Sequence, residues 1–193
     1  MDNENTVENK FETFPLTPER WGDFEKLFGP HGATSGCWCM WWRMTRSDFS
    51  KTSGLEKKNC LLDIVNEKRV PGILGYLEGK PVAWCSIAPR DEFPSLDRSN
   101  VLARVDEKVV WSMVCFYFAV GFRRKGLMGK MIEAGVAFAK ERGAKIVEAY
   151  PIDPQRKISS SEVFSGLASA FVKAGFIEVA RRSPSRPVMR LDI

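Results

Sequence analysis

Residues 109–151 carry the pattern that most restricts the fold, because they predict two strands joined through a helix. The segment 109–118, VVWSMVCFYF, is apolar and rich in β-branched and aromatic residues, as expected of a central strand buried on both faces. Apolar residues recur at helical spacing from Met128 to Ala139, and Gly143 marks the helix end. A second strand is predicted at 144–151. Strands joined by a crossover helix are usually parallel neighbours, so this unit predicts a parallel pair.

The rest of the chain completes one mixed α/β sheet with helices. Helices are predicted at 17–28, 55–69 and 159–174. A β-hairpin is predicted at 73–77 and 82–88, followed by a polar loop with one short helix at 89–108. A further strand is predicted at 176–182, and 188–192 is a candidate for another. The third helix starts at a Ser159–Glu162 capping box, and its inward face is expected to hold Phe164, Leu167, Ala168, Phe171 and Val172. Residues 1–10 are predicted to be a frayed polar tail, and residues 11–193 a single domain.

The composition limits the classes of protein to which the chain can belong. Its 193 residues are 44% hydrophobic and 27% charged, as in an ordinary folded protein. A net charge of +5 suits a polyanionic partner or a pocket for one phosphorylated ligand. No apolar run is long enough to span a bilayer, and the polar N-terminus lacks the regions of a signal peptide. Five cysteines, an odd number without a secretory signal, indicate free thiols in a reducing cytoplasm. We therefore expect a cytoplasmic protein, and no membrane partner.

The turn between the central strand and the helix, GFRRKGLMGKMI (121–132), predicts a phosphate site. The first amides of a helix lack partners and carry its positive dipole end, and Gly126 allows close backbone approach. The sequence matches neither the P-loop nor the dinucleotide fingerprint. Its charge is compact instead of spread along a face, so no nucleic acid is expected as a partner. A solvated basic turn remains the alternative, and nucleic-acid binding ranks last, although the pI and Arg181, Arg182 and Arg186 suggest it.

Two motifs resemble those of the GNAT superfamily of acyl-CoA-dependent N-acyltransferases. Residues 123–128, RRKGLM, resemble its [RQ]-x-x-G-x-[GA] signature, and SAFVKAGFIEV (169–179) resembles its "lYeklGF" segment. CWCMWWR and VEAYPID are similar to an uncharacterised bacterial branch of that superfamily. The resemblance implies a central mixed sheet, mostly antiparallel with one parallel pair at a V-shaped cofactor split, flanked by helices. The last position of the motif should hold a small residue, glycine or alanine. Met128 stands there, and its place in the helical apolar series favours a side chain that points into the core.

The resemblance also implies where acetyl-CoA binds as co-substrate. Its pantetheine would pair with the backbone of Phe116, Tyr117 and Phe118, in the split of the sheet. Its pyrophosphate would meet the amides and charges of the basic turn. The cofactor-binding residues are then Phe116, Tyr117, Phe118, Arg123, Arg124, Lys125, Gly126, Leu127, Met128, Gly129 and Lys130.

The activity implied is transfer of an acetyl group to a primary amine of a small molecule or peptide, directly in a ternary complex. Such transfer needs a base, an oxyanion contact and protonation of the thiolate. An amide near Phe118 would hold the oxyanion, and Glu148 is the candidate base. Glu148 could equally face solvent or pair with an arginine; Asp106 and Glu107 are weaker candidates.

The resemblance implies no general acid at the usual position, because Phe171 stands where the family usually has a tyrosine. Tyr150, Tyr117 or a water remain as replacements. The loss of that tyrosine also leaves open a second reading, a catalytically weak or inactive CoA-binding regulatory module. A homodimer paired through an edge strand or the C-terminal tail is open as well.

The segment 32–44 concentrates unusual residues. Trp38, Trp42 and Arg43, with Arg90 nearby, are candidates for the amine pocket, and core packing is the alternative for each. No metal is expected, because a C-x-C pair with one distant cysteine and one histidine is poor spacing for a zinc site; these residues are Cys37, Cys39, Cys60 and His31. Cys115 is expected to be a small buried hydrophobe.

Overall fold

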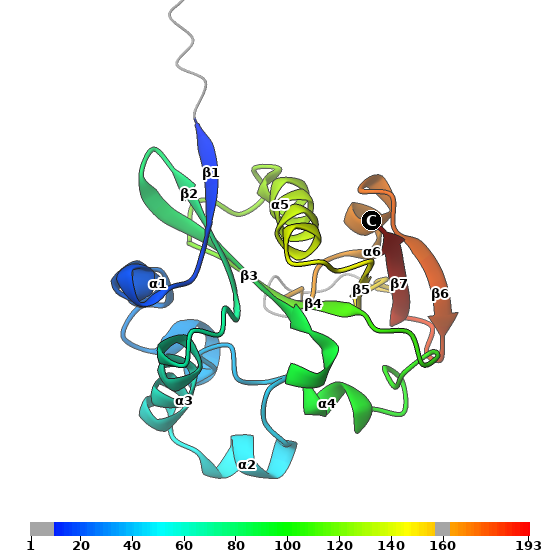
Figure 1. The fold of residues 1–193 in the computed structure, drawn as a ribbon, viewed down its shortest axis with the longest axis horizontal. Helices are drawn as coiled ribbons and strands as arrows, with labels where there is room; N and C mark the ends of the chain where they lie inside the picture. The colour runs from blue at the N-terminus through cyan, green and yellow to red at the C-terminus, as the bar shows by residue number, and fades with distance from the viewer. Residues whose placement is uncertain (1–9, 157–162) are drawn as a thin grey trace, which may run out of the picture.

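A computed structural model describes residues 10–156 and 163–193 and contains one seven-stranded sheet (Figure 1). The strand order is β1-β2-β3-β4-β5-β7-β6. The strands are β1 (Phe11–Pro15), β2 (Gly72–Leu77), β3 (Lys80–Pro89), β4 (Trp111–Phe118), β5 (Ile146–Ala149), β6 (Ile177–Arg181) and β7 (Pro187–Asp192). The helices are α1 (Trp21–Phe28), α2 (Arg46–Lys51), α3 (Gly54–Asn66), α4 (Pro94–Asp97), α5 (Leu127–Glu141) and α6 (Ala168–Lys173).

The pairing of the strands confirms the predicted mixed sheet. β4 and β5 pair in parallel, and the other neighbours described in the sheet are antiparallel. The predicted hairpin is β2–β3, and the candidate strand at the C-terminus is β7. β7 lies between β5 and β6, so the last strand of the chain is not at the edge of the sheet.

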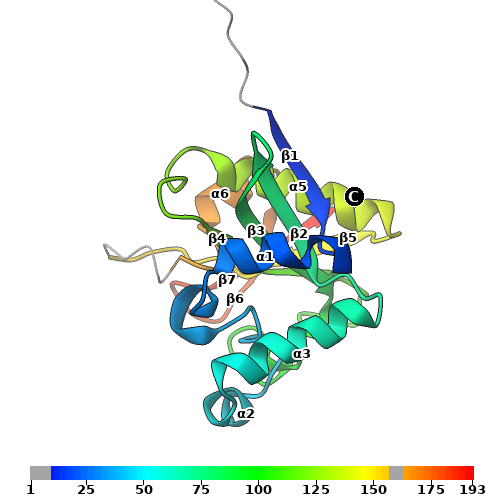
Figure 2. The same cartoon turned by 90° about the vertical axis from the view of Figure 1, so that its left-hand side faces the viewer.

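Helices cover both faces of the sheet, with α5 on one side and α3 on the other (Figures 1 and 2). On the α5 side, Met131, Ile132 and Phe138 pack against Met113 and Phe116 of β4 in one apolar cluster, which α6 joins through Phe171. The opposite face carries two further clusters. One contains residues of α1, α3 and the segment before α2, and the other contains residues near α4. No described helix combines the length and the apolarity needed to cross a membrane.

The structure corrects several predicted boundaries. β1 and α2 lie in segments for which no element was predicted. The predicted helix 159–174 is wrong over 163–167, because α6 begins only at Ala168. Gly166 has a φ of +83°, Leu167 is extended, and Val172 is 60% exposed instead of inward-facing. The capping box and nearly all of the predicted N-terminal tail lie outside the described residues.

Candidate active site

The two parallel strands separate after a short paired region. β4 and β5 are in register only at Trp111–Val147, Ser112–Glu148 and Met113–Ala149. β5 ends there, whereas β4 continues to Phe118. The β3–β4 register also shifts at this level, because Ser86 pairs with Cys115 and Ile87 with Met113, which leaves Val114 as an extra residue. The sheet therefore opens between β4 and β5 from Val114 onward.

A segment of the chain itself lies in this opening. The Phe116 amide of β4 donates a hydrogen bond of 2.6 Å to the Phe164 carbonyl oxygen. On the other side, the Ile152 amide donates to the Gly166 carbonyl oxygen at 2.9 Å, and Leu167 forms a parallel bridge with Ile152. The backbone of 164–167, here called the wedge segment, thus bonds to both sides of the split. A ligand that pairs with the Phe116 amide has to replace the Phe164 carbonyl.

The basic turn leads from β4 into α5 with its backbone in left-handed conformations. Gly121, Arg124 and Gly126 have φ angles of +89°, +62° and +74°. Arg123 Nε donates to the Phe118 carbonyl at 3.2 Å, which ties the turn to the end of β4. A Cβ built on Gly126 or Gly129 meets nothing within 4 Å, so the start of α5 is open to a ligand.

The side chains of the turn divide between solvent and core. Arg124 and Lys125 are exposed, and the Lys125 ammonium lies 5.2 Å from the centre of the Phe122 ring. Lys130 is exposed too, 5.7 Å from the Phe11 ring of β1. Leu127 is buried, and Met128 packs against the core on the α5 side. Met128 therefore faces the core, as its place in the helical apolar series suggested.

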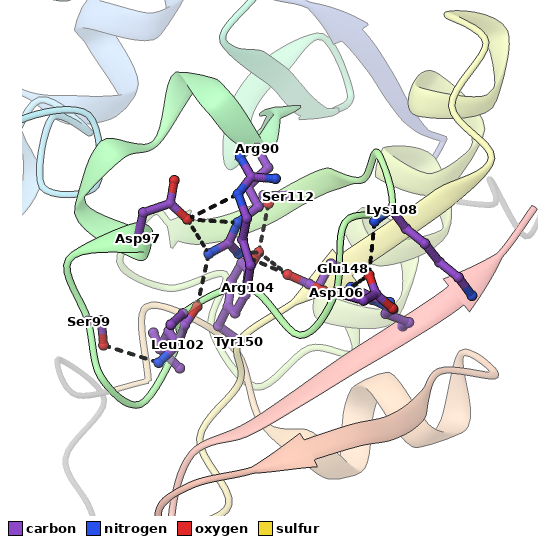
Figure 3. Close-up of polar contacts among 12 residues, drawn as sticks. Arg90, Asp97, Ser99, Leu102, Arg104, Asp106, Lys108, Ser112, Glu148 and Tyr150 are labelled. Atoms are coloured by element: carbon purple, nitrogen blue, oxygen red, sulfur yellow. Dashed lines mark hydrogen bonds and ion pairs between the residues drawn. The ribbon is translucent and has the colours of Figure 1, made fainter.

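Glu148 lies in the core at the start of the split, where Figure 3 shows it beside Arg90 and Tyr150. It is 1% exposed. Its Oε1 accepts hydrogen bonds from Arg90 Nη1 at 2.9 Å and from the Tyr150 hydroxyl at 2.6 Å. Its Oε2 accepts one from Arg190 Nε at 2.7 Å. The carboxylate is thus paired with arginine, one of the two alternatives open from the sequence, and direct contact with an acceptor would require these partners to move.

Tyr150 connects Glu148 to β4. Its hydroxyl is 2.7 Å from Ser112 Oγ, and it also accepts a hydrogen bond from Arg90. Tyr150 and Ser112 are fully buried. Burial and the neighbouring charge of Glu148 raise the pKa of the Tyr150 phenol well above its usual value, so the phenol keeps its proton at neutral pH.

The two arginines extend this buried network to the surface. Arg90 donates to Asp97 Oδ1 at 2.8 Å and to the Leu102 carbonyl at 3.0 Å. Arg190 holds both oxygens of Asp106, at 2.7 and 3.0 Å, which lowers the pKa of Asp106 to about 2. Asp106 is therefore a poor base at neutral pH. Glu107 is exposed at the surface.

The residues predicted for the amine pocket have different surroundings. Trp38 is buried against Phe28 in a stacked pair 5.9 Å apart. Arg43 binds the Glu92 carboxylate and the Pro71 carbonyl, and Arg90 belongs to the network around Glu148. The Trp42 ring lies 6.3 Å from the Phe164 ring of the wedge segment, and its buried indole N–H has no acceptor among residues 10–156 and 163–193.

A sequence profile described as "Acetyltransferase (GNAT) family" matches residues 38–157, which is more than half of the chain. The chain belongs to the GNAT acetyltransferase family. The match includes β4, the basic turn, α5 and β5. No curated protein matches the chain in sequence.

Solved structures share the GNAT fold at low sequence identity. The PaiA N-acetyltransferase of Thermoplasma acidophilum, in complex with coenzyme A, is 11% identical with a TM-score of 0.54, and the alignment covers 95% of this chain and 99% of that one. A GNAT acetyltransferase of Listeria monocytogenes is 13% identical with a TM-score of 0.57, over 95% of both chains. An uncharacterized protein of Bacillus halodurans is 14% identical with a TM-score of 0.57, over 94% of this chain and 83% of that one.

Sequence reasoning missed the partners of the predicted site residues. Arg190, Ser112 and the wedge segment were not singled out, yet they contact Glu148, Tyr150 and Phe116. One signal was present for Arg190, which is a lone basic residue on an apolar strand, as Glu148 is a lone acidic one. Buried charges of opposite sign usually pair, so these two residues could have predicted that their strands are neighbours in the sheet.

Proposed function

We propose that the protein transfers an acetyl group from acetyl-CoA to a primary amine of a small molecule or peptide, directly in a ternary complex. The observation that carries this is the open, glycine-containing basic turn at the start of α5, beside a split in the sheet of a GNAT-family chain. The amides from Arg124 to Gly129 and the cations Arg124 and Lys125 suit a pyrophosphate. The PaiA relative in complex with coenzyme A supports the same cofactor class.

Direct calorimetric titration with acetyl-CoA, followed by detection of released thiol with a panel of amines, tests this function. We expect micromolar binding that exceeds the binding of free pyrophosphate, and thiol release with at least one class of amine. Absence of binding at low and moderate salt would contradict the proposed cofactor site.

The same proposal assigns proton transfer to Glu148, acting through Tyr150. Glu148 and Tyr150 are both buried in the free chain, so an amine would reach this pair through a water or after the wedge segment, whose Phe164 packs in the same cluster as Tyr150, has moved. The Tyr150 hydroxyl donates to Glu148 Oε1 and could pass on a proton as it accepts another. Arg90 and Arg190 keep the carboxylate in place. A backbone amide of β4 near Phe118 would stabilise the oxyanion.

Glu148→Gln and Tyr150→Phe test this assignment. Both variants are expected to lower kcat by about 100-fold or more at every pH tested. Glu148→Gln removes the proposed proton acceptor, and Tyr150→Phe removes the hydroxyl that connects it to the amine. The Kd for acetyl-CoA should stay within about twofold, since neither residue belongs to the basic turn. Turnover is measured by thiol release, and a thermal melt confirms that each variant is folded at the assay temperature.

Glu178→Gln is the matched control, because Glu178 is an exposed carboxylate of β6 that pairs with Arg181. Its turnover should equal that of the wild type. If both folded test variants keep the wild-type rate, Glu148 is not the base.

A CoA-binding regulatory module is the second candidate function. Phe171 favours it, since this side chain lies buried between the rings of Phe116 and Phe176 and offers no hydroxyl to protonate a leaving thiolate. Acetyl-CoA binding without thiol release across the amine panel would select this candidate.

A further inference from the structure

One arginine in the turn between β6 and β7 is half-buried without a carboxylate partner. The guanidinium of Arg186 donates a hydrogen bond to Ser165 Oγ at 3.3 Å, and no carboxylate of residues 10–156 and 163–193 pairs with it. Burial lowers the pKa of Arg186, and no neighbouring carboxylate counteracts this shift. By contrast, each arginine that the structure describes as buried pairs with a carboxylate; these are Arg43, Arg90 and Arg190. A charge is costly to bury alone, so Arg186 is suited to an anion from outside the chain.

Arg186 lines a cavity of about 530 Å³ that also involves the chain just after β5. The described residues that line it include two arginines, Arg156 and Arg186, and no acidic residue. Asp153, which lies between two of the lining residues in the sequence, pairs its carboxylate with Arg181 at 2.9 Å. The cavity is therefore positively charged, and Gln155 adds an amide to its wall.

Hydrogen bonds join the two sides of this cavity. The Asp153 amide donates to the Ser185 carbonyl oxygen at 2.9 Å, and Gln155 Nε2 donates to the Pro184 carbonyl oxygen at 3.4 Å. The segment that follows β5 and the turn before β7 are thus held together in the free chain. A site that is formed before binding loses little conformational entropy when it takes a ligand, which favours affinity.

The register of β5 and β7 places Arg186 on the same face of the sheet as Tyr150. The strands pair with Ala149 opposite Met189, and the backbone hydrogen bond across the cavity continues this antiparallel register. Arg186 is then level with Ile152, two residues beyond Tyr150 in the chain, and alternate residues of a strand share a face. Two residues of extended backbone span about 7 Å. An anion held by Arg186 would therefore lie several bonds away from an amine that reaches Tyr150.

The wedge segment connects this cavity to the split between β4 and β5. Ser165, the hydrogen-bond acceptor of Arg186, belongs to the wedge segment and is fully buried. Ile152 lines the cavity, and its amide also bonds to Gly166 of the same segment. A movement of the wedge segment that admits acetyl-CoA would therefore also release the Arg186 guanidinium for a ligand.

We propose that Arg186 binds an oxyanion, a carboxylate or a phosphate, on the amine that accepts the acetyl group. This inference rests on the proposed function and narrows its acceptor to a chemical class. The planar guanidinium can donate two parallel hydrogen bonds to either oxyanion, which sets the orientation of the acceptor as well as its position. The acceptor is then an amine whose negative charge lies several bonds from the amino group, as in an ω-amino acid, a short peptide or a phosphorylated amine.

Calorimetric titration of the intact protein with matched probes tests the anion site without turnover. The probes are γ-aminobutyrate against γ-aminobutyramide, and O-phosphoethanolamine against ethanolamine, each with and without saturating CoA. We expect at least one oxyanion to bind the wild type about tenfold or more tightly than its counterpart without the anion, and the two pairs show which oxyanion it is. Arg186→Met should remove that preference.

Arg182→Met is the matched control and should keep the preference, because Arg182 lies in the same turn but donates to backbone carbonyls of residues 101–104. Thermal melts should show Arg186→Met folded, since its substitution leaves no carboxylate unpaired. The inference is wrong if the wild type prefers neither oxyanion, or if the preference survives in Arg186→Met.

Turnover separates a failure of this inference from a failure of the proposed function. Acceptors found by thiol release should carry an oxyanion, and Arg186→Met should raise their KM about tenfold or more while kcat changes by less than about twofold. Equal turnover of amines with and without an oxyanion would overturn the inference and leave acetyl transfer intact. Binding that depends on Arg186, without thiol release from any amine, would support the anion site and contradict the proposed transfer.

Discussion

Gly126→Glu is expected to weaken acetyl-CoA binding by about 100-fold or more, which corresponds to about 2.8 kcal/mol. Gly126 has a φ of +74° at the cap of α5, where a side chain adds backbone strain. The new carboxylate would also lie at the helix end that we propose for the pyrophosphate, so like charges would meet there. Calorimetric titration with acetyl-CoA measures the loss.

Gly126→Asn separates the two causes, because asparagine tolerates the left-handed conformation and carries no charge. We expect it to lose less than about tenfold in affinity. Thermal melts should show both variants folded, since a Cβ at Gly126 meets no neighbouring atom within 4 Å. Wild-type affinity in Gly126→Glu would remove the basic turn as the phosphate site.

Arg90→Met should lower the free energy of unfolding by about 3–5 kcal/mol, the usual effect of removing one partner of a buried ion pair. Arg90 is 2% exposed and donates to Glu148, Tyr150, Asp97 and the Leu102 carbonyl. Methionine fills much of the same space but leaves these acceptors short of a donor. Urea denaturation followed by circular dichroism measures the change.

Arg181→Met is the matched control, because Arg181 is an exposed arginine that also pairs with two carboxylates, Glu178 and Asp153. Surface pairs of this kind contribute about 0–1 kcal/mol. A loss in Arg90→Met no larger than in Arg181→Met would show that the buried network does not stabilise the fold.

The parts of the fold that were predicted correctly depend on local patterns. The apolar run of β4, the helical spacing in α5 and the Gly79 turn between β2 and β3 are each readable within a few residues. The basic turn was located for the same reason, since a glycine and three cations directly precede a helix. The parallel β4–β5 pair followed from a general rule about crossover connections.

The parts that were missed depend on contacts between distant residues. β1 is a five-residue edge strand that is only half-buried, and it is held by pairing with β2 across the intervening helices. The residues 163–167 have an apolar pattern that fits a helix, but their bonds to Ile152 and Phe116 hold them extended or turned. The two arginine partners of Glu148 lie 58 and 42 residues away in the sequence, so the sequence identified the charged residue but not the residues that surround it.

The wedge segment has a consequence for the thermodynamics and rate of ligand capture. Since the Phe116 amide already donates to Phe164 in the free chain, a pantetheine carbonyl that takes this amide exchanges one hydrogen bond for another. The net enthalpy of that contact should then be small. In the proposed binding mode, most of the affinity would come from the contacts between the pyrophosphate of acetyl-CoA and the basic turn. In the binding mode that we propose, association would also wait for Phe164 to withdraw, so the observed binding rate should level off at high ligand concentration instead of rising in proportion to it.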